Sequence, residues 1–377
     1  MDRSEKTIPP LNHIPAEVVC ASDYELLAPN FIAPDRMAYI SGGSGHDLTL
    51  EQNLRAFSDY SITPRMMRDL SNGNTKTELL GQPFQHPIFL APVAYQALAH
   101  SQAEVASASA AEATDSCMVA STLSSASLEQ IAEHAGPYRW FQLYFQPRQE
   151  DTQSLIQRAI TAGYKAIVVT VDAAIQAPSL RAIRAGFKFP KHIKPANTAH
   201  QKPVVPPATT ADQSPVFQSY MQNSPSREQL KKLINESPIP VFIKGVLHPE
   251  DAQELKAMGA AGIIVSNHGG RTLDGAPASL SALPAIREAV GKEFPLLLDS
   301  GIRSGSDIFK AIALGADAVL IGRLQVYALS VAGALGVAHM LKLLREELEL
   351  SMAMAGCSTI NQIKQTELQS IRSHGTC

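Results

Sequence analysis

PLLLDSGIRSGSDIFKAIALGADAVLIGR, residues 295–323, contains two short apolar runs separated by an amphipathic stretch. The runs PLLLDSG (295–301) and DAVLIGR (317–323) each have the length of one strand and are almost continuously apolar. The stretch between them, SGSDIFKAIALG, has an acidic residue near its start and ends at a glycine, which is typical of a helix. Such a strand–helix–strand unit predicts parallel strands that are buried on both faces.

The same alternation runs through the chain from about residue 85. Eight apolar runs that alternate with helical stretches predict an α/β protein, a closed (β/α)8 TIM barrel. An open doubly wound sheet is the main rival, but no G-x-G-x-x-G follows the first run. The six other runs are HPIFLAPVA (86–94), CMVAST (117–122), RWFQLYF (139–145), KAIVVTVD (165–172), IPVFIKGV (239–246) and AGIIVSNH (261–268).

Two regions lie outside this alternation. We expect residues 1–84 to form a helical N-terminal lid segment with short extra strands under the barrel. Residues 190–226, rich in Pro, Ala and Thr, form a long loop after the fourth strand, which is typical of an active-site lid or of a disordered segment. The whole chain, 1–377, is predicted to be one domain.

Two pairs of residues have the spacing of a helix N-terminal capping box. Ser101 with Glu104, and Ser127 with Gln130, each precede a stretch with helical periodicity. We expect a helix to begin directly after Ser101 and another after Ser127.

The composition limits the class of protein. The chain has 377 residues, 45% of them hydrophobic and 18% charged, with a formal net charge of -3. Soluble domains usually carry about 25% charged residues, so a large share of this chain is expected to be buried. The slightly acidic balance provides no basic field for nucleic acid or anionic lipid. No apolar run of about 18 residues is apparent, so no integral membrane segment is predicted.

The N-terminus and the cysteines indicate the compartment. MDRSEKTIPP lacks the basic-then-apolar order of a secretory signal. Cys20, Cys117, Cys357 and Cys377 lie far apart without a C-x-x-C pair. This pattern favours reduced thiols in the cytoplasm over a disulfide framework or a metal site.

The most informative motif is SNHGGR (266–271), at the end of the sixth predicted strand. His268 ends a buried strand, and Arg271 follows across two glycines that permit close approach of a ligand. In these barrels the strand ends form the active site. A base beside a guanidinium suits the oxidation of an anionic hydroxy acid, because the guanidinium holds the carboxylate while the imidazole takes a proton.

The last two strands are each followed by glycine and arginine. DSGIR (299–303) and IGR (321–323) lie where barrels of this kind often bind a phosphoryl group through backbone N–H groups and arginines. We therefore expect a phosphate site there.

In these motifs the chain resembles the FMN-dependent 2-hydroxy acid oxidase and dehydrogenase family. That family includes glycolate oxidase, lactate oxidase, mandelate dehydrogenase and 4-hydroxymandelate oxidase. The resemblance extends from about Tyr24 to about Cys357. It rests on SNHGGR together with WFQLY (140–144), FIKG (242–245), LLLDSGIRSG (296–305) and ALGADAVLIGR (313–323).

The resemblance implies a catalytic set. His268 would be the base, and Asp172 would stabilise the imidazolium that forms. Arg271, assisted by Tyr24, would bind the substrate carboxylate. Tyr144 would hydrogen-bond the substrate near its reacting carbon.

The resemblance also implies FMN as the cofactor and a set of residues that hold it. Lys244 would stabilise negative charge on the reduced flavin ring. Residues that would contact the flavin ring are Val93, Ala94, Ser121, Gln142, Thr170 and Ser266. Residues that would hold the ribityl chain and phosphate are Asp299, Gly301, Arg303, Gly322 and Arg323.

One position departs from the family pattern. Members usually carry an arginine that faces the active site seven residues after the aspartate matched by Asp172, and Ser179 stands there. Arg181 and Arg184 lie nearby, but their offset changes the direction of the side chain, so the role is not transferred. Arg271 would then be the main clamp for the carboxylate.

The sequence leaves several functions open. The leading hypothesis is oxidation of an (S)-2-hydroxy acid to the 2-oxo acid, with O2 reoxidising the flavin and giving H2O2. A dehydrogenase that passes electrons to a quinone or another carrier shares the first half-reaction. A flavin-free aldolase that uses Lys244 as a Schiff base, and a flavin-binding relative with altered or lost activity, are further alternatives. The resemblance implies a homo-oligomer, a tetramer or octamer.

Overall fold

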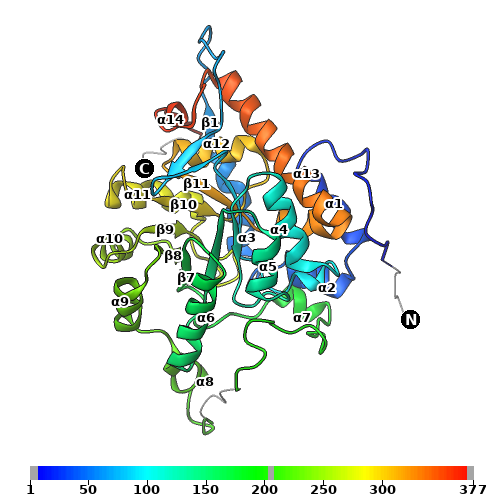
Figure 1. The fold of residues 1–377 in the computed structure, drawn as a ribbon, viewed down its shortest axis with the longest axis vertical. Coiled ribbons are helices and arrows are strands. Elements are labelled where there is room, and N and C mark those ends of the chain that lie inside the picture. The colour runs from blue at the N-terminus through cyan, green and yellow to red at the C-terminus, as the bar shows by residue number, and fades with distance from the viewer. Residues whose placement is uncertain (1–6, 203–207, 372–377) are drawn as a thin grey trace, which may run out of the picture.

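The computed structural model describes residues 7–202 and 208–371, and its centre is a closed barrel of eight parallel strands. Each strand falls within one of the eight predicted runs, and the last pairs with the first, Val319 opposite Ile88. The predicted barrel is therefore confirmed, and Figure 1 shows its strands enclosed by helices. The strands are β4 (Ile88–Leu90), β5 (Met118–Ala120), β6 (Arg139–Leu143), β7 (Ile167–Thr170), β8 (Val241–Val246), β9 (Gly262–Val265), β10 (Leu296–Asp299) and β11 (Ala318–Ile321).

Helices pack around the barrel because their apolar faces cover the outward side chains of the strands. They are α4 (Ala103–Ala113), α5 (Leu128–His134), α6 (Gln149–Thr161), α9 (Arg227–Glu236), α10 (Pro249–Ala257), α11 (Ser279–Val290), α12 (Gly305–Ala313) and α13 (Arg323–Ala355).

One of the two predicted capping boxes is present. Ser127 and Gln130 cap α5 reciprocally, as expected. The box at Ser101 is wrong: α4 begins at Ala103, and Glu104 is fully buried. Its carboxylate accepts the backbone N–H groups of Gln96 and Ser125, which lie in the segments that follow β4 and β5. A buried carboxylate needs such donors, and this demand overrides the local capping pattern.

The interior of the barrel is filled by aromatic and aliphatic side chains. Trp140 stacks on Phe242 with ring centroids 4.5 Å apart, and Phe89 packs edge-on against Trp140. The hairpin of β2 (Thr77–Leu79) and β3 (Gln82–Phe84) places Phe84 against Phe89 at 4.9 Å. The amino ends of the strands are thereby filled with apolar side chains.

The described part of the N-terminal extension contains helices, the β2–β3 hairpin and one further short strand, β1. Strand β1 pairs with β12 (Leu368–Ser370) near the other end of the chain. The elements of the extension are α1 (Asp23–Leu27), η1 (Ala28–Asn30), α2 (Pro34–Ser41), α3 (Leu48–Arg55), η2 (Ala56–Asp59) and β1 (Tyr60–Ile62).

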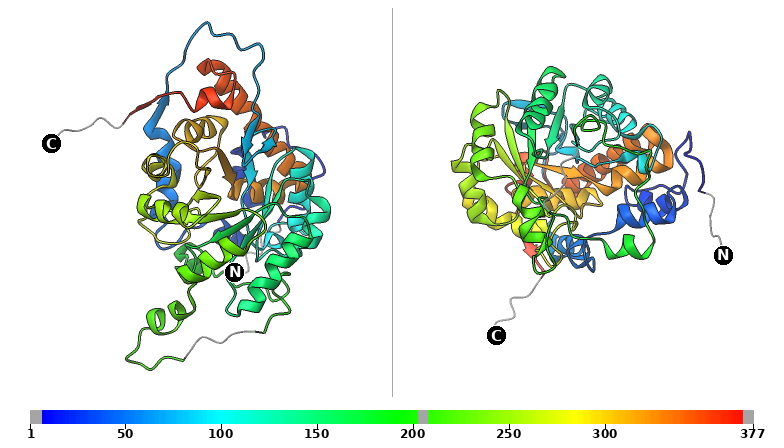
Figure 2. Two further views of the ribbon diagram at one scale, coloured as in Figure 1. Left: turned by 60° about the vertical axis from the view of Figure 1, so that its left-hand side comes forward. Right: turned by 90° about the horizontal axis from the view of Figure 1, so that it is seen from below.

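The segment after β7 begins with α7 (Leu180–Arg184), which packs against α2. The predicted loop 190–226 contains α8 (Pro215–Gln218) and η4 (Tyr220–Asn223), and residues 203–207 within it lie outside the described residues. Figures 1 and 2 show α8 at the end of a loop that projects from the barrel. A last short helix, α14 (Ile360–Ile363), precedes β12. The organisation of residues 1–377 as one domain stays a prediction.

Helix α13 corrects one expectation. It is long and apolar enough to cross a membrane, whereas the sequence suggested no such run. However, 78% of its most apolar window is buried inside the fold, which is typical of a core helix. Its backbone is also kinked at Ala332 and Gly333. The absence of an integral membrane segment stays a prediction.

Candidate active site

A cavity of about 1510 Å³, counting its open mouth, lies at the carboxyl ends of the barrel strands. It is lined by residues from most strand ends and from the N-terminal extension. The fold thus brings together side chains that are far apart in the sequence. The predicted site residues that line it are Val93, Ala94, Ser121, Tyr144, Lys244, His268, Arg271, Asp299, Gly301, Arg303, Gly322 and Arg323.

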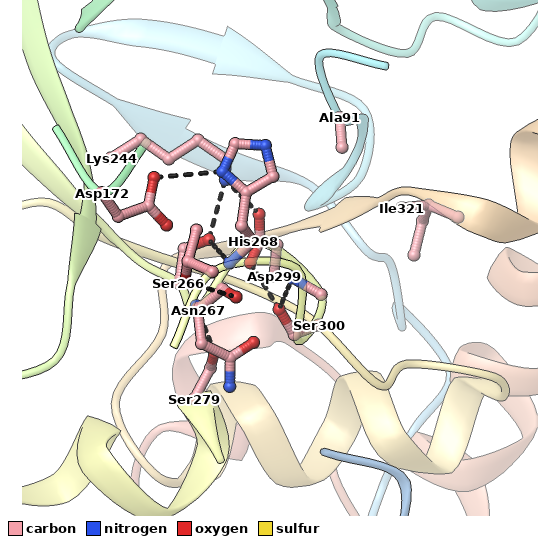
Figure 3. A network of polar contacts seen from close by, with 12 residues as sticks. Ala91, Asp172, Lys244, Ser266, Asn267, His268, Ser279, Asp299, Ser300 and Ile321 are labelled. Atoms are coloured by element: carbon pink, nitrogen blue, oxygen red, sulfur yellow. Dashed lines mark hydrogen bonds and ion pairs between the residues drawn. The ribbon is translucent and has the colours of Figure 1, made fainter. Parts of the chain in front are cut away.

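His268 and Asp172 form a hydrogen-bonded pair at this cavity. His268 Nδ1 lies 3.0 Å from Asp172 Oδ1, and Figure 3 shows the imidazole directed at the carboxylate. An ionised carboxylate only accepts hydrogen bonds, so Nδ1 carries the proton and Nε2 is left free as a base. Burial alone would raise the pKa of Asp172, but the hydrogen bond from His268 and the nearby charges of His268 and Lys244 hold it below its ordinary value.

The backbone around this pair is unusual in two places. His268 has φ +59°, a left-handed conformation that is rare outside glycine and often marks functional sites. Gly245 has φ +103°, and a Cβ at that position would lie 2.5 Å from the Cβ of Asp172. Glycine at 245 therefore leaves room for the carboxylate to reach the histidine.

Asn267 holds the His268 loop in place, and the sequence did not single it out. Its side-chain amide exchanges two hydrogen bonds with the Asn53 amide of α3, at 2.7 and 2.9 Å. Both asparagines are buried. The only signal in the sequence was the position of Asn267 beside the histidine of the motif.

Lys244 is buried at the cavity floor and forms an ion pair. Its Nζ lies 2.9 Å from Asp299 Oδ2 and donates to Ser266 Oγ at 2.7 Å. Burial alone would lower the pKa of Lys244, but Asp299 and Asp172 outweigh it and hold the pKa above its ordinary value. A protonated amine is not a nucleophile, so this geometry argues against the aldolase alternative.

Three arginines converge on the cavity, and each also contacts the N-terminal extension. Arg271 donates to the carbonyls of Tyr39 and Gly42, at 2.8 and 3.0 Å. Arg303 forms an ion pair with Glu25 of α1 at 2.6 Å. Arg323 donates to the Gly42 carbonyl at 2.7 Å. The extension therefore completes the charged part of the site.

The electrostatics of these arginines favour an anion. Burial, reinforced by Arg271 and Arg303, lowers the pKa of Arg323 to about 10, so the group is still charged at neutral pH. Gly301 supplies a backbone with φ +87°, and a Cβ there would lie 2.2 Å from the Asn53 carbonyl oxygen. All three arginines are half-buried, and of the three only Arg303 has an ion-pair partner among the described residues. A phosphate group would supply the counter-charge for the others.

The predicted substrate contact at Tyr24 is wrong. Tyr24 is fully buried between α1 and α13, and its hydroxyl is hydrogen-bonded to His339 Nδ1 at 3.0 Å. The tyrosine of the extension that lines the cavity is Tyr39 in α2. The Arg271 guanidinium lies 4.9 Å from the centre of the Tyr39 ring. Both tyrosines occupy short helices, and only the packing of those helices decides which one reaches the site.

Comparison with known proteins gives the family. The sequence model described as FMN-dependent dehydrogenase matches residues 28–370. The chain belongs to this family. L-lactate oxidase of Alicycliphilus denitrificans is 55% identical to it over 359 residues, 95% of this chain and 98% of that protein. 2-Hydroxyacid oxidase 1 of Homo sapiens is 36% identical over 355 residues, 93% of this chain and 96% of that protein.

A solved structure agrees with these relatives. Mandelate oxidase with (S)-2-phenylpropionate superposes with a TM-score of 0.84 at 37% identity, covering 93% of this chain and 98% of that one. The comparisons confirm the predicted family and its cofactor, so the chain is an FMN-dependent oxidoreductase.

Buried polar atoms beside the cavity fit the flavin. Gln142 Nε2 and Thr170 Oγ1 are both buried and have no hydrogen-bond partner within the described residues. Buried donors of this kind are costly unless a partner is present, and the polar edge of a flavin ring would provide one. Gln142, Thr170 and Ser266 are not among the residues that line the cavity, and their predicted flavin contacts stay predictions.

Ser179 does not supply a cation to the site. It is the N-cap of α7, where its hydroxyl accepts a hydrogen bond from the Ala182 N–H. Neither Arg181 nor Arg184 lines the cavity, and Arg181 instead pairs with Asp47 at 2.7 Å. A second, smaller cavity borders Ser179, Gln176 and Arg271. Of Arg181, Arg184 and Arg271, only Arg271 therefore lines the cavity that also contains His268.

Aromatic side chains form one wall of the main cavity. Phe189, from the segment after α7, packs edge-on against Tyr95 with ring centroids 4.5 Å apart. Phe187 stacks on Tyr39 at 4.4 Å. Tyr95, Phe189, Tyr39 and Leu123 all line the cavity. Arg271 lies against this wall at Tyr39, 4.9 Å from the ring centre, whereas Tyr95, Leu123 and Phe189 carry no charge.

Proposed function

We propose that this protein oxidises an (S)-2-hydroxy acid to the corresponding 2-oxo acid, with O2 as the final electron acceptor and H2O2 as the second product. The observation that carries the proposal is the His268–Asp172 pair at 3.0 Å, in the same cavity as Arg271. A base and a fixed cation are the two groups that an anionic hydroxy acid requires. The oxidase names of the relatives support O2 over a quinone.

In this mechanism His268 removes a proton from the substrate, at the carbon that is oxidised or at its hydroxyl group. Its Nε2 is the free nitrogen, because Nδ1 donates to Asp172. When the imidazole becomes charged, the adjacent carboxylate stabilises it. Bound FMN supplies the two-electron acceptor for the oxidation.

The other residues bind and orient the substrate. Arg271 holds the carboxylate, and its contacts to the Tyr39 and Gly42 carbonyls fix the guanidinium. Tyr144 lines the cavity, and burial raises the pKa of its hydroxyl, so it acts as a neutral hydrogen-bond donor to the substrate. Lys244 provides a fixed positive charge that Asp299 keeps protonated.

The substrate we propose has an apolar side chain, and L-lactate is the first candidate. The wall of Tyr95, Leu123 and Phe189 offers no charged partner for a side chain. The similar proteins support this class, because their names refer to L-lactate and to mandelate.

An anaerobic titration of the FMN-loaded protein tests the proposal. Glycolate, L-lactate, D-lactate and (S)-mandelate are added separately, and bleaching of the flavin absorbance is followed. We expect L-lactate to bleach the flavin and D-lactate to leave it oxidised. On admission of air, one H2O2 should form per 2-oxo acid. If bleached enzyme regained colour only with an artificial acceptor, the dehydrogenase alternative would replace the oxidase.

A second candidate is a flavin-binding relative with altered activity. Ser179 favours it, since no arginine is present at the position where the family usually has one. FMN content equal to one per chain, without bleaching by any substrate of the panel, would support this candidate over the first.

We further propose a cytoplasmic homo-oligomer, a tetramer or octamer. The cysteines Cys20, Cys117 and Cys357 are free thiols, which suits a reducing compartment; Cys377 lies outside the described residues. Exposed apolar side chains such as Met67 and Leu350 are available for subunit contacts. Light scattering during size-exclusion chromatography measures the assembly directly.

A further inference from the structure

The segment that follows β7 has a charge pattern unlike the rest of the chain. The chain as a whole contains 35 acidic residues and 32 Lys or Arg. Residues 173–211 contain no Asp or Glu at all. The basic residues within this stretch are Arg181, Arg184, Lys188, Lys191, Lys194 and Lys202.

This segment borders the active-site cavity. Phe189, which follows Lys188 directly, lines the main cavity, and Phe187 lines the smaller cavity beside Arg271. The stacking of Phe187 on Tyr39 and the packing of Phe189 against Tyr95 fix the backbone on either side of Lys188. Lys188 thus lies between two residues that line these cavities.

A buried asparagine fixes the segment again eight residues after Phe189. Asn197 is fully buried, and its Nδ2 donates to the Ser121 carbonyl at 3.2 Å and to Ser124 Oγ at 2.9 Å. Its Oδ1 accepts the Leu128 N–H at 2.8 Å. The chain is therefore anchored beside the cavity at Phe189, which lines it, and at Asn197, which donates to the carbonyl of the lining residue Ser121.

The three lysines between Phe187 and Asn197 are exposed and pair with no acidic residue in the described part of the chain. Lys188, Lys191 and Lys194 are exposed, and none forms an ion pair with a residue in the described ranges 7–202 and 208–371. Arg181, by contrast, is neutralised by Asp47. Exposed charges act in water over about 8 Å at physiological ionic strength. We call Lys188, Lys191 and Lys194 the cationic rim.

We propose that the cationic rim attracts anionic substrate to the cavity and so raises the rate of its capture. The inference rests on the proposed function, because it requires the substrate to be a carboxylate. Charges of one sign around a cleft raise the local concentration of an oppositely charged ligand. The rim would then deliver the carboxylate toward Arg271, and it would take no part in the oxidation itself.

The test replaces the three rim lysines together, as Lys188→Gln, Lys191→Gln and Lys194→Gln. A matched control replaces three exposed lysines elsewhere, as Lys76→Gln, Lys231→Gln and Lys292→Gln, so that both variants lose the same net charge. Anaerobic stopped-flow measures the second-order rate constant of flavin reduction by L-lactate between about 0.01 and 1 M NaCl, over which the screening length falls from about 30 to 3 Å.

At low salt we expect the second-order rate constant of flavin reduction to be about tenfold lower in the rim variant than in the wild type. The control variant should have the wild-type rate constant. At high salt all three should converge, and the rate at saturating substrate and the FMN content should be unchanged throughout. Equal rates for rim variant and wild type at low salt, or an equal loss in the control, would overturn the proposal.

A binding measurement separates this proposal from the proposed function. Oxalate, a dicarboxylate that carries no oxidisable C–H bond, is titrated while the flavin absorbance is recorded. If hydroxy acids failed to bleach the flavin but the rim variant bound oxalate more weakly at low salt than the control did, the proposed function would fail and the rim would stand. Sedimentation with phosphatidylglycerol vesicles tests whether the lysines bind an anionic membrane surface instead. If the rim variant lost vesicle binding while its rate constants with substrate were unchanged, the lysines would be assigned to that role and the proposal would be overturned.

Discussion

The cofactor side and the substrate side of the cavity are built in different ways. On the cofactor side, Asp299, Gly301 and Arg303 come from one short segment after β10, and Gly322 and Arg323 come from another after β11. The substrate side takes Tyr39 from α2, Tyr95 from the loop after β4 and Phe189 from the segment after α7. The barrel fixes the charged groups, His268 and Arg271 among them, whereas segments outside the barrel strands supply the aromatic side chains of the substrate side.

Substitutions on the two sides should therefore affect different properties of the protein. A strand end is held by hydrogen bonds to two neighbouring strands, so its side chains have little freedom. The substrate wall depends on contacts between segments, such as the Tyr39–Phe187 stack and the Asn197 hydrogen bonds. The wall can therefore change its size without disturbing the cofactor site.

The largest expected effect is at the strand-end base. His268→Gln removes the proton acceptor, so flavin reduction should slow by about 10³-fold, within the usual range for general base catalysis. Because His268 is not part of the phosphate site, the FMN content should stay the same. Anaerobic stopped-flow measures the rate, and flavin absorbance gives the content. A variant that still reduced its flavin at the wild-type rate would remove His268 from the mechanism.

Arg271 lies at the border of the two sides. Arg271→Lys keeps the charge but loses the paired N–H groups that fit a carboxylate, so kcat/KM should fall about 100-fold, mainly through KM. Steady-state kinetics with L-lactate gives both constants. An unchanged KM would show that the substrate carboxylate binds elsewhere.

Arg323 tests the cofactor side. Arg323→Ala should weaken FMN binding about 10- to 100-fold, since a hydrogen bond to a charged group contributes about 1.5–3 kcal/mol. Flavin fluorescence, which rises on release, measures the dissociation constant. The exposed Arg345→Ala serves as the control, because Arg345 contacts only Glu349 among its described ion pairs. Equal FMN affinity in the two variants would place the phosphate away from Arg323.

The pKa of Asp172 predicts a dependence of stability on pH. A carboxyl group with a lowered folded-state pKa stabilises the fold above its ordinary pKa of 3.8, and this contribution is lost as the pH falls through the folded-state value. Asp172→Asn should therefore cost about 2 kcal/mol at pH 7, and the difference from wild type should shrink below pH 3.8. Denaturant unfolding at several pH values measures it. A gap that stayed constant down to pH 2.5 would contradict the assignment.

The smallest effect is expected at Tyr24. Tyr24→Phe removes the hydrogen bond to His339 and should lower the free energy of unfolding by about 1 kcal/mol, with kcat and KM unchanged. Tyr39→Phe is the comparison, since Tyr39 lines the cavity. An altered KM in the Tyr24 variant alone would restore the contact that the sequence suggested.

Most of the barrel was predictable because its strands are buried on both faces. A strand such as Leu296–Asp299 has to be apolar whatever its neighbours are, so it stands out in the sequence. His268, Arg271 and Arg323 were predictable for a related reason, because polar side chains at the ends of apolar runs converge in any closed parallel barrel.

Other residues were missed because their roles depend on distant partners. Glu104 has the spacing of a capping residue, yet it is buried and accepts N–H groups from two strand-end loops. Asn53 and Asn267 are unremarkable singly and form a buried pair only once α3 packs beside β9. Tyr24 and Tyr39 are alike in the sequence, and the placement of α1 against α13 decides between them.

Short-range patterns of apolar and polar residues were enough to predict the barrel and the charged groups at its strand ends, and the resemblance of the motifs to a known family implied the cofactor. The packing of distant segments, by contrast, decides which tyrosine faces the substrate, how Asp172 is held beside His268, and where the lysines of the segment after β7 lie. Those features depend on contacts between segments far apart in the chain, and the local pattern of a segment does not specify its distant partner.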